Sequence, residues 1–416
     1  MSEVETLVVG AGQAGLAVSY HLGRLGCEHL VLERHEVGST WRRERWDSFA
    51  LVTQNWQLRL PGFAYAGDEP EGFLTREGVI RHLDAYAASF RPPVACGVEV
   101  RRVLAAPSGA GYVVEAEGAR YRAANVVLAN GAFPLPEVPA LSARLPAGVH
   151  QLHATGYRNP RALPDGAVLV VGSGQSGTQI ARELALSGRR VYLSVGSSGK
   201  VLRRYRGQDI THWVQRSGQY DRTIDELVAA GQRPQKNPHI GIDLPALARQ
   251  TELVLLGRLA GVEGGVAHFA PDLNARLRAW DDDVARLRRQ IDEFIAAEGL
   301  SAPVEPSPPP TEPLPEVTRL DLGAEGVAAV IWATGYRFDR SLVPLPVWGP
   351  DGAPEHRRGV TALPGLYFLG LHYLHTLKSG LLFGVGDDAA YLAAHIAERR
   401  RAGGGAAGSG PRRGPS

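Results

Sequence analysis

The sequence predicts an α/β protein with two Rossmann-like dinucleotide-binding domains, the second inserted in the first. A glycine-rich segment, GAGQAG at residues 10–15, stands between an apolar run and a segment of helical periodicity. A near copy, GSGQSG at residues 172–177, stands in the same setting. Elsewhere, short apolar runs that end in glycine alternate with helical periodicity, which is typical of parallel sheets with crossover helices.

The first domain is expected to begin with a strand, a helix and a second strand. The strand covers residues 5–10 (ETLVVG), the helix residues 13–25, and the second strand residues 29–34 (HLVLER). Residues 123–131 (AANVVLANG) are another buried strand that ends in glycine.

The same cycle restarts in the second domain, with a strand at residues 167–172, a helix at 175–187 and a strand at 189–195. Residues 206–300 are then mostly helical. They include a capping box at Thr223 and Glu226. An amphipathic helix follows, with apolar residues that recur every three or four positions: Leu277, Trp280, Val284, Leu287, Ile291 and Phe294.

A proline-rich connection at residues 302–315 leads to two late buried strands, within 327–336 (VAAVIWATGY) and 364–372 (PGLYFLGLH). The tail is glycine-rich and is expected to be disordered. The predicted boundaries are therefore residues 1–160 and 318–400 for the first domain, 161–317 for the second, and 401–416 for the tail.

Composition excludes several classes of function. Lysine and arginine number 45 and aspartate and glutamate 43, so the formal net charge is only +2, and neither nucleic acid nor an acidic membrane is an expected partner. No apolar run is long enough for a membrane span, and no basic region precedes the first strand, so a cytoplasmic location is expected. The two cysteines, Cys27 and Cys96, form no CxxC motif, so neither a redox pair nor a metal site is expected.

The first glycine loop has the residues that a dinucleotide site needs. Gly10 permits the tight turn, Gly12 lets the backbone approach a pyrophosphate, and Gly15 lets the helix pack closely on the strand. The second strand ends at Glu33, where a carboxylate binds the ribose hydroxyls.

The second loop carries the same glycines but no such acid. Gly172, Gly174 and Gly177 repeat the spacing, and Val195 stands at the offset that Glu33 has in the first copy. Nearby residues instead carry hydroxyls and positive charge, which fit the 2′-phosphate of NADPH: Ser194, Ser197, Ser198, Lys200, Arg203 and Arg204. The alternative is a solvated basic loop. Two loops with different chemistry favour a tightly held flavin and an exchangeable nicotinamide that reduces it.

With these motifs the chain resembles the class B flavin-containing monooxygenases, which include the plant indole-pyruvate monooxygenases and small bacterial relatives. Residues 10–15 resemble the FAD loop of the family, 37–62 the segment that runs under the flavin, 172–177 the NADPH loop, 330–339 (VIWATGYRFD) a crossover segment, and 365–389 the closing FAD segment. The family fingerprint before the second loop is only partly present. His153 and Tyr157 have the right spacing, but Ala147 replaces phenylalanine and Gly148 is one place off.

The resemblance implies FAD and NADPH as cofactors, and a small-molecule substrate and O2 as reactants. The flavin, once reduced by NADPH, forms a C4a-hydroperoxide, which transfers one oxygen atom to a soft nucleophile: an amine nitrogen, a thioether sulfur or a 2-oxo acid. Two alternatives stay open, an NADPH-dependent flavin oxidase or reductase without oxygen transfer, and a non-catalytic nucleotide-binding protein. The oligomeric state also stays open, with a homodimer as one alternative.

The resemblance also implies site residues. Asn55 and Lys378 are the candidate catalytic residues, and each has a loop-structuring role as its alternative. The substrate pocket is expected from Trp56, Tyr205, Trp213, Tyr220 and Phe383. The remaining cofactor contacts are expected at Gln13, Ala14, Arg34, Thr40, Trp41, Trp46, Val100, Asn130, Gly131, Gln175, Ser176, Thr334, Gly335, Gly370, Ser379 and Gly380. His153 is interpreted as structural, and the HxxH motif of His372 and His375 is not expected to bind metal.

Overall fold

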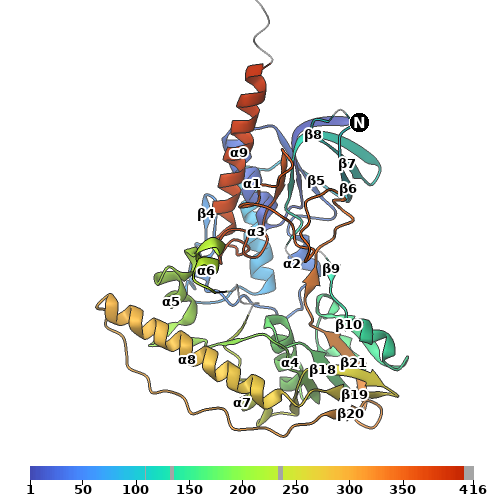
Figure 1. Cartoon of the computed structure of the whole chain (residues 1–416), viewed down its shortest axis with the longest axis vertical. Helices are drawn as coiled ribbons and strands as arrows, with labels where there is room; N and C mark the ends of the chain where they lie inside the picture. The colour runs from blue at the N-terminus through green and yellow to red at the C-terminus, as the bar shows by residue number, and fades with distance from the viewer. Residues whose placement is uncertain (108, 132–134, 233–237, 407–416) are drawn as a thin grey trace, which may run out of the picture.

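Two parallel sheets with the same strand order form the framework of the molecule (Figure 1). The computed structural model describes residues 1–107, 109–131, 135–232 and 238–406, with side chains up to residue 402. In the first sheet the order is β5 (Val94–Cys96), β2 (His29–Glu33), β1 (Ser2–Val9), β8 (Ala119–Leu128), with β23 (Leu366–Phe368) beside the end of β8. In the second sheet it is β17 (Leu253–Leu256), β12 (Val191–Ser194), β11 (Ala167–Val171), β21 (Val327–Trp332), β10 (His150–His153).

Each parallel sheet has antiparallel strands next to it. In the first unit these are β7 (Tyr112–Ala116) and β6 (Val100–Ala105), which extend the sheet from the first half of β8. In the second unit a separate meander is formed by β18 (Leu259–Glu263), β19 (Val266–Phe269) and β20 (Arg319–Asp321). The mixed α/β class predicted from the sequence is confirmed, and the duplication of the glycine loop extends to the whole strand order.

Two strands lie outside the second domain as the sequence predicted it. β10 and β21 both pair with the second sheet, although the expected boundaries assign residues 150–153 and 327–332 to the first domain. From the sequence, the segment with the ATG motif was expected to belong to the first domain. In the structure this motif follows β21, where the chain leaves the second sheet. The chain crosses between the sheets through β9 (Leu135–Pro136) and β22 (Tyr336–Arg337), which pair with each other.

The helix after the first glycine loop packs on the first sheet and is itself contacted by two longer helices. α1 (Gln13–Arg24) packs beside α9 (Val385–Ala406), the long helix at the top of Figure 1. α3 (Arg76–Phe90) contacts α1 and the short α2 (Ser39–Arg43). Because α9 continues to Ala406, residues 401–406 are helical and the predicted disordered tail is wrong there; residues 407–416 lie outside the described residues.

The second unit is covered by α4 (Gln175–Leu186), α7 (Leu244–Ala248) and α8 (Leu273–Ala297). The predicted amphipathic face of α8 is confirmed, since Leu277, Trp280, Val284 and Ile291 are buried. Residues 210–229 extend away from the second unit, and we call this segment the excursion. It contains three short helical elements: α5 (Ile210–Arg216), η5 (Gln219–Asp221) and α6 (Ile224–Ala229), where the predicted capping box is present. In Figure 1, α5 and α6 lie at the left, at a height between the two sheets, with α6 near the start of α9.

The other regular elements are short. They are β3 (Arg59–Leu60), β4 (Phe63–Ala64), β13 (Lys200–Val201), β14 (Arg204–Tyr205), β15 (Gln208–Asp209), β16 (His239–Ile240), η1 (Asn55–Gln57), η2 (Ala140–Arg144), η3 (Ala154–Gly156) and η4 (Pro160–Ala162).

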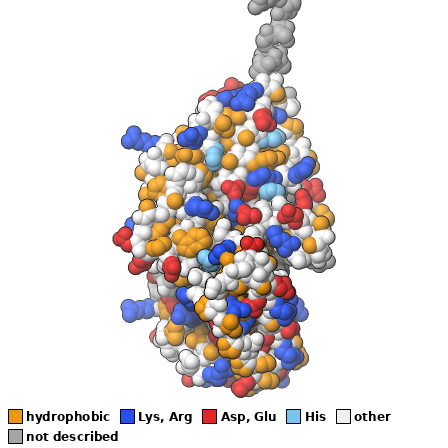
Figure 2. All heavy atoms as spheres, turned by 90° about the vertical axis from the view of Figure 1, so that its left-hand side faces the viewer, with side chains coloured by type: hydrophobic (Ala, Val, Ile, Leu, Met, Phe, Trp, Pro, Cys, Tyr) orange, Lys and Arg blue, Asp and Glu red, His pale blue; other side chains and the backbone are white. Residues whose placement is uncertain are grey.

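Among the described residues, no helix is long and apolar enough to cross a bilayer, and no group of three or more potential ligand side chains is arranged to hold a metal ion. On the face shown in Figure 2, acidic and basic side chains are interspersed, and no broad basic surface is present there.

Candidate active site

The three glycines of the first loop have three different physical roles. Gly10 has φ = +102°, and a Cβ atom there would lie 2.7 Å from the carbonyl oxygen of Ala129. A Cβ on Gly15 would overlap the carbonyl oxygen of Gly10. A Cβ on Gly12, by contrast, would meet no protein atom within 4 Å. Gly10 and Gly15 are therefore required by the fold, whereas Gly12 faces open space of the kind that a bound pyrophosphate needs.

The second loop repeats this division. Gly172 has φ = +109°, and a Cβ there would overlap the carbonyl oxygen of Ala333. A Cβ on Gly177 would overlap the Gly172 carbonyl oxygen, and one on Gly174 would meet nothing within 4 Å. Both loops also contact the end of the neighbouring strand, at Ala129 and at Ala333. The two predicted loops thus have one geometry.

The helices that follow the loops begin with uncapped amide groups. Gly12 and Gly174 are the N-cap residues of α1 and α4, and neither helix has a side-chain cap or an acidic residue in its first turn. The free N–H groups and the helix dipole make each end attractive to an anion. The residues present at both loops therefore fit a dinucleotide phosphate.

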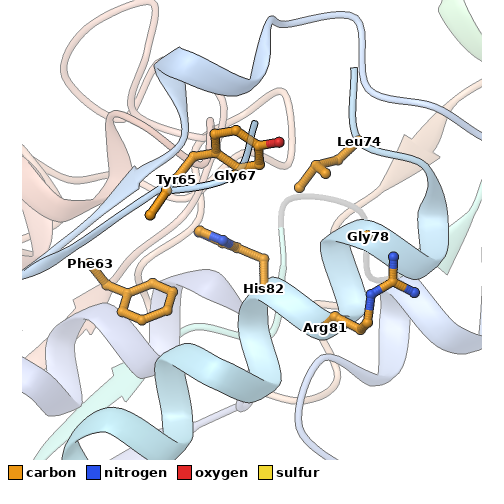
Figure 3. Close-up of a pocket in the computed structure, with 8 residues that line it drawn as sticks. Phe63, Tyr65, Gly67, Leu74, Gly78, Arg81 and His82 are labelled. Atoms are coloured by element: carbon orange, nitrogen blue, oxygen red, sulfur yellow. The ribbon is translucent and has the colours of Figure 1, made fainter. Parts of the chain in front are cut away.

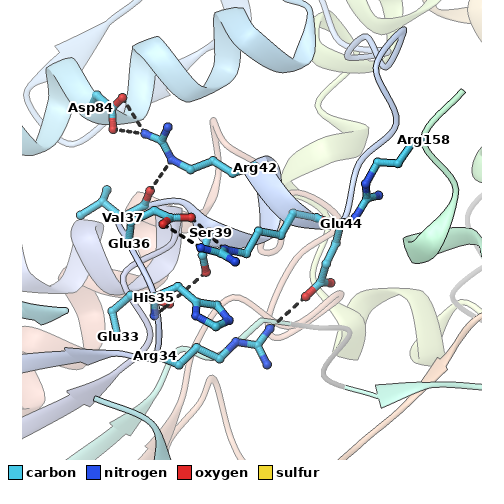
Figure 4. Close-up of polar contacts among 11 residues, drawn as sticks. Glu33, Arg34, His35, Glu36, Val37, Ser39, Arg42, Glu44, Asp84 and Arg158 are labelled. Atoms are coloured by element: carbon cyan, nitrogen blue, oxygen red, sulfur yellow. Dashed lines mark hydrogen bonds and ion pairs between the residues drawn. The ribbon is translucent and has the colours of Figure 1, made fainter. Parts of the chain in front are cut away.

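Glu33 is held rigidly at the first loop (Figure 4). Its Oε2 accepts a hydrogen bond of 2.8 Å from the backbone N–H of Ala11, inside the loop. Its Oε1 accepts from the Ser39 hydroxyl at 2.9 Å and from the His35 N–H at 3.1 Å. The carboxylate is only 6% exposed. The acid predicted for the ribose thus lies beside the loop, where its orientation is set before any ligand binds.

No acid lies at the corresponding end of β12. The Ser173 hydroxyl accepts from the Gly196 N–H at 3.0 Å and lies 3.0 Å from the Ser198 hydroxyl. Arg276, from α8, donates to the Gly196 carbonyl oxygen at 2.9 Å, and its Nε is buried without a hydrogen-bond partner. Arg276 thus brings a positive charge to the loop after β12, where it also pairs with Asp272 at 2.6 Å. Sequence reasoning missed Arg276 because it lies far along the chain, on the amphipathic helix.

Three residues predicted for the NADPH phosphate make other contacts. The Ser194 hydroxyl donates to Gly257 O at 3.0 Å and accepts from Leu259 N–H at 2.9 Å, so it joins β12 to the next turn. Arg203 donates to the Val52 carbonyl oxygen at 2.9 Å and pairs with Asp209 at 2.8 Å. Arg204 is exposed and donates to Gly207 O at 2.7 Å. Ser197 is exposed at the end of β12. Lys200 follows on β13, with Nζ 3.8 Å from Asp243.

Beside the second loop lies a buried histidine. His239 on β16 is fully buried, and its ring stands edge-on to Trp280 with centroids 4.7 Å apart. Burial, together with the nearby Lys200 charge, lowers the pKa of His239 to about 4. Gln175, at the start of α4, accepts a hydrogen bond of 2.9 Å from the backbone N–H of Ile240, the residue after His239. The Nε2 atom of Gln175 has no hydrogen-bond partner.

Asn55 is engaged in holding a loop. Its Nδ2 donates to the Glu69 carbonyl oxygen at 2.9 Å, and its Oδ1 accepts from Leu74 N–H at 2.7 Å. These contacts favour the structural alternative over the predicted role as a free donor beside the flavin. Trp56 likewise donates to Gln54 Oε1 at 2.9 Å. Gln57, two residues on, is fully buried with both amide atoms unpaired, and nothing in the sequence distinguished it.

Lys378 also has fixed partners. Its Nζ lies 2.6 Å from Asp221 and 2.7 Å from Asp387, so its charge is balanced. This favours the loop-structuring alternative over the predicted stabilisation of negative charge on the reduced flavin. The Ser379 hydroxyl accepts from two backbone amides of its own turn. Gly370 lies against α1, since a Cβ there would be 2.7 Å from Ala14 Cβ.

The crossover residues are joined by His153. Its ring contacts the Gly335 carbonyl oxygen at 3.0 Å through Nε2, and its Nδ1 accepts from Thr155 N–H at 3.2 Å. The Thr334 hydroxyl donates to the Glu137 carbonyl oxygen. These contacts favour the structural interpretation of His153. In the first unit the equivalent turn is exposed at Asn130 and at Gly131, which has φ = +96°.

Other predicted cofactor residues divide between the two units. The Trp41 indole donates to Gln13 Oε1 at 3.0 Å beside the first loop, and Arg34 pairs with Glu44 at 2.9 Å (Figure 4). Trp46 is buried in the core of the second unit, with Tyr157 and Leu163, which corrects its predicted place at the flavin. Four predicted cofactor residues remain. Thr40 is exposed, Val100 pairs with Ala116 in the first sheet, Ser176 is half-buried in the first turn of α4, and Gly380 adjoins His372.

The predicted substrate pocket is only partly assembled. Tyr220 and Phe383 are in contact, with ring centroids 5.0 Å apart. Tyr205 and Trp213 instead form a small core with Ile291 of α8, and the Trp213 indole donates to Tyr205 O. Their predicted place in the pocket is therefore corrected.

A separate cavity of about 260 Å³ lies between α3 and the segment after β4 (Figure 3). It is lined by Phe63, Tyr65, Ala66, Gly67, Leu74, Gly78, Arg81 and His82. None of these residues belongs to either glycine loop.

Comparisons with known proteins agree with this geometry. The model of the pyridine nucleotide-disulphide oxidoreductase family matches residues 7–229. The chain is 32% identical to an uncharacterized CzcO-like oxidoreductase of Geobacillus kaustophilus, over 94% of this chain and 97% of the relative. It is 27% identical to the indole-3-pyruvate monooxygenase YUCCA4 of rice, over 72% and 74% of the two chains. Its fold is similar to that of a flavin-containing monooxygenase from Stenotrophomonas maltophilia, with a TM-score of 0.68, 20% identity, and coverage of 96% of this chain and 100% of the other.

Proposed function

Because the chain belongs to the pyridine nucleotide-disulphide oxidoreductase family and, within it, to the class B flavin-containing monooxygenases, we propose that it transfers one oxygen atom from O2 to a small soft nucleophile. It is an enzyme, a flavin-dependent oxidoreductase that uses FAD and NADPH. The nucleophile is an amine nitrogen, a thioether sulfur or a 2-oxo acid. The observation that carries this proposal is the pair of equivalent loops, with Glu33 beside only the first.

In this proposal FAD binds at the first loop. Its pyrophosphate meets the open face of Gly12 and the uncapped start of α1, and its ribose hydroxyls bind Glu33. The segment near Gly370 closes over the start of α1. The nicotinamide-binding unit is inserted in this FAD-binding unit between the two crossovers.

NADPH binds at the second loop, at Gly174 and the start of α4. We assign its 2′-phosphate to the end of β12, where Ser197 is exposed and Arg276 and Lys200 supply positive charge. The carboxylates nearby are paired with these cations, Asp272 with Arg276 at 2.6 Å and Asp243 with Lys200 at 3.8 Å.

When bound, FAD supplies the chemistry: it accepts the reducing equivalents of NADPH and activates O2 for transfer of one oxygen atom. The chain's part is to bind and orient both cofactors and to exclude water. Cys27 is buried and Cys96 is exposed, and both are free thiols, so they offer no disulfide to receive the electrons. This favours oxygen as the acceptor.

The test is turnover under 18O2 with NADPH and three probes: thioanisole, N,N-dimethylaniline and phenylpyruvate. We expect one labelled oxygen atom in the product of at least one probe, and less peroxide than NADPH consumed. Peroxide equal to the NADPH consumed, with every probe and without labelled product, would instead identify an NADPH oxidase. A protein that purifies without flavin and takes up none would contradict both.

A further inference from the structure

The excursion of the second unit is fastened to the closing segment of the first by Lys378. Lys378 precedes α9, and its ammonium lies 2.6 Å from Asp221 of η5 and 2.7 Å from Asp387 in the first turn of α9. Only 16% of the Lys378 side chain is exposed, whereas both carboxylate side chains are more than half exposed. One lysine thus joins an element of each unit.

Two further contacts accompany this ion pair. The Ile224 N–H donates to the His375 carbonyl oxygen at 2.9 Å, and Thr223 and Thr376 form an isolated β-bridge. The rings of Tyr220 and Phe383 are in contact. The excursion therefore lies on residues 375–383, directly after the segment that crosses the start of α1.

Both ends of the connection are rigid. On the first unit, Leu381 N–H donates to Lys378 O at 2.8 Å, and a Cβ on Gly384 would overlap that carbonyl oxygen, so the turn around Lys378 is tightly packed. On the second unit, the Tyr205 hydroxyl donates to Asp292 of α8 at 2.8 Å, and Trp213 of α5 packs in the same small core as Ile291.

Helix α8 also connects the excursion to the second glycine loop. Its residues Leu277 and Trp280 belong to the same buried core as residues of α4, the helix that follows this loop. A continuous set of packed elements therefore runs from the second loop through α8, α5 and η5 to Lys378.

The charges suit a contact that opens and closes. Burial by itself would lower the pKa of Lys378, but hydrogen bonds to Asp221 and Asp387 outweigh that effect and raise it, so the ammonium keeps its proton. Because the carboxylates face solvent, each pair is weak and is screened by salt. Such a pair influences the position of an element without locking it.

We propose that Lys378 is a positioning residue, a latch that holds the excursion on the closing segment and so keeps the nicotinamide-binding unit at the distance that flavin reduction requires. The inference rests on the proposed function, since it assigns the two units to NADPH and FAD. Reduction depends steeply on distance, because the reacting atoms must approach to about 3–3.5 Å. Loss of the latch should therefore change the rate of flavin reduction, although Lys378 lies far from the reacting atoms.

The experiment compares Lys378→Met with Arg358→Met in the full chain. Arg358 pairs with Asp388 at 3.0 Å at the same end of α9, but both partners belong to the first unit, so this variant controls for the loss of an ion pair that does not join the two units. Three quantities are measured: FAD content, the anaerobic rate of flavin reduction by NADPH, and hydrogen exchange of the peptide that contains Ile224.

For Lys378→Met we expect unchanged FAD content, reduction slowed by about 2- to 10-fold, and faster exchange at Ile224. Arg358→Met should match the wild type in rate and exchange, and Lys378→Arg should restore both. At saturating NADPH, added salt should slow the wild type more than it slows Lys378→Met.

Wild-type rate or wild-type exchange in Lys378→Met overturns the latch, and so does loss of FAD, which would place Lys378 at the flavin. If NADPH fails to reduce the wild-type flavin, the proposed function fails, and the exchange of Ile224 still decides whether Lys378 holds the excursion.

Discussion

The carboxylate of Glu33 accepts a 2.8 Å hydrogen bond from the backbone N–H of Ala11, which ties the end of β2 to the first glycine loop. In the second unit Ser173 occupies the position of Ala11, and its side chain bonds Gly196 N–H while Arg276 bonds Gly196 O. The first loop thus has a carboxylate bonded to its backbone, whereas the backbone after β12 in the second unit has an arginine, which also pairs with Asp272. This difference leads to separate expectations for the two cofactors.

Gly12→Ala should give a folded protein that lacks FAD. The new methyl group meets no protein atom within 4 Å but occupies the space assigned to the pyrophosphate. FAD content, read from the flavin absorbance, should fall by at least about tenfold, a change of about 1.4 kcal/mol in binding. Gly15→Ala is the contrasting variant: its methyl overlaps Gly10 O, so stability should fall by about 1–3 kcal/mol or more. A fully yellow Gly12→Ala protein would place FAD elsewhere.

Arg276→Leu should weaken NADPH and leave NADH almost unaffected. Only NADPH carries the 2′-phosphate, and a charge-assisted hydrogen bond contributes about 1.5–3 kcal/mol, or roughly 10- to 100-fold in affinity. The measurement is the ratio of the two dissociation constants. Arg204→Leu serves as the control, because Arg204 is exposed and donates only to the nearby Gly207 carbonyl. Equal losses for both nucleotides would assign Arg276 a purely structural role.

Asn55→Ala should mainly lower the free energy of unfolding rather than change the reaction with O2. The substitution leaves Glu69 O and Leu74 N–H without their partner, at a cost of about 1–3 kcal/mol for each group that stays buried. Urea unfolding should detect this loss. A variant with unchanged stability but a changed reaction with O2 would restore Asn55 as a catalytic residue.

Acid should destabilise the protein through His239. The pKa of His239 is lowered from 6.5 to about 4 by burial and by Lys200, so the unfolded chain takes up the proton first as the pH falls. The stability linked to the neutral ring is therefore complete above about pH 6.5 and is lost progressively toward pH 4. Between pH 6.5 and 5 the loss amounts to about 2 kcal/mol.

His239→Leu should flatten this part of the pH profile, measured by urea unfolding at both pH values. Substitution of the exposed His150 by leucine should leave the slope unchanged. The same slope in wild type and His239→Leu would mean that other groups, such as His372, whose pKa burial also lowers to about 4, dominate the acid transition.

The sequence by itself determined the features that depend on local backbone and local periodicity. The two glycine loops, the strands before them, the helices after them, the position of Glu33 and the buried face of α8 all follow from residues a few positions apart. A glycine that needs positive φ, as Gly10 and Gly172 do, or an apolar residue at every third or fourth position has the same consequence wherever the segment lies.

Tertiary structure decided which polar side chains remain available at the sites. Asn55, Ser194 and Lys378 were plausible ligands in the sequence, but carbonyls, amides and carboxylates from other elements already engage them. Arg276 reaches the end of β12 from 80 residues away, and Trp46 crosses into the core of the second unit. The availability of a hydrogen-bonding group depends on partners that only the folded chain brings together, and no local pattern encodes them.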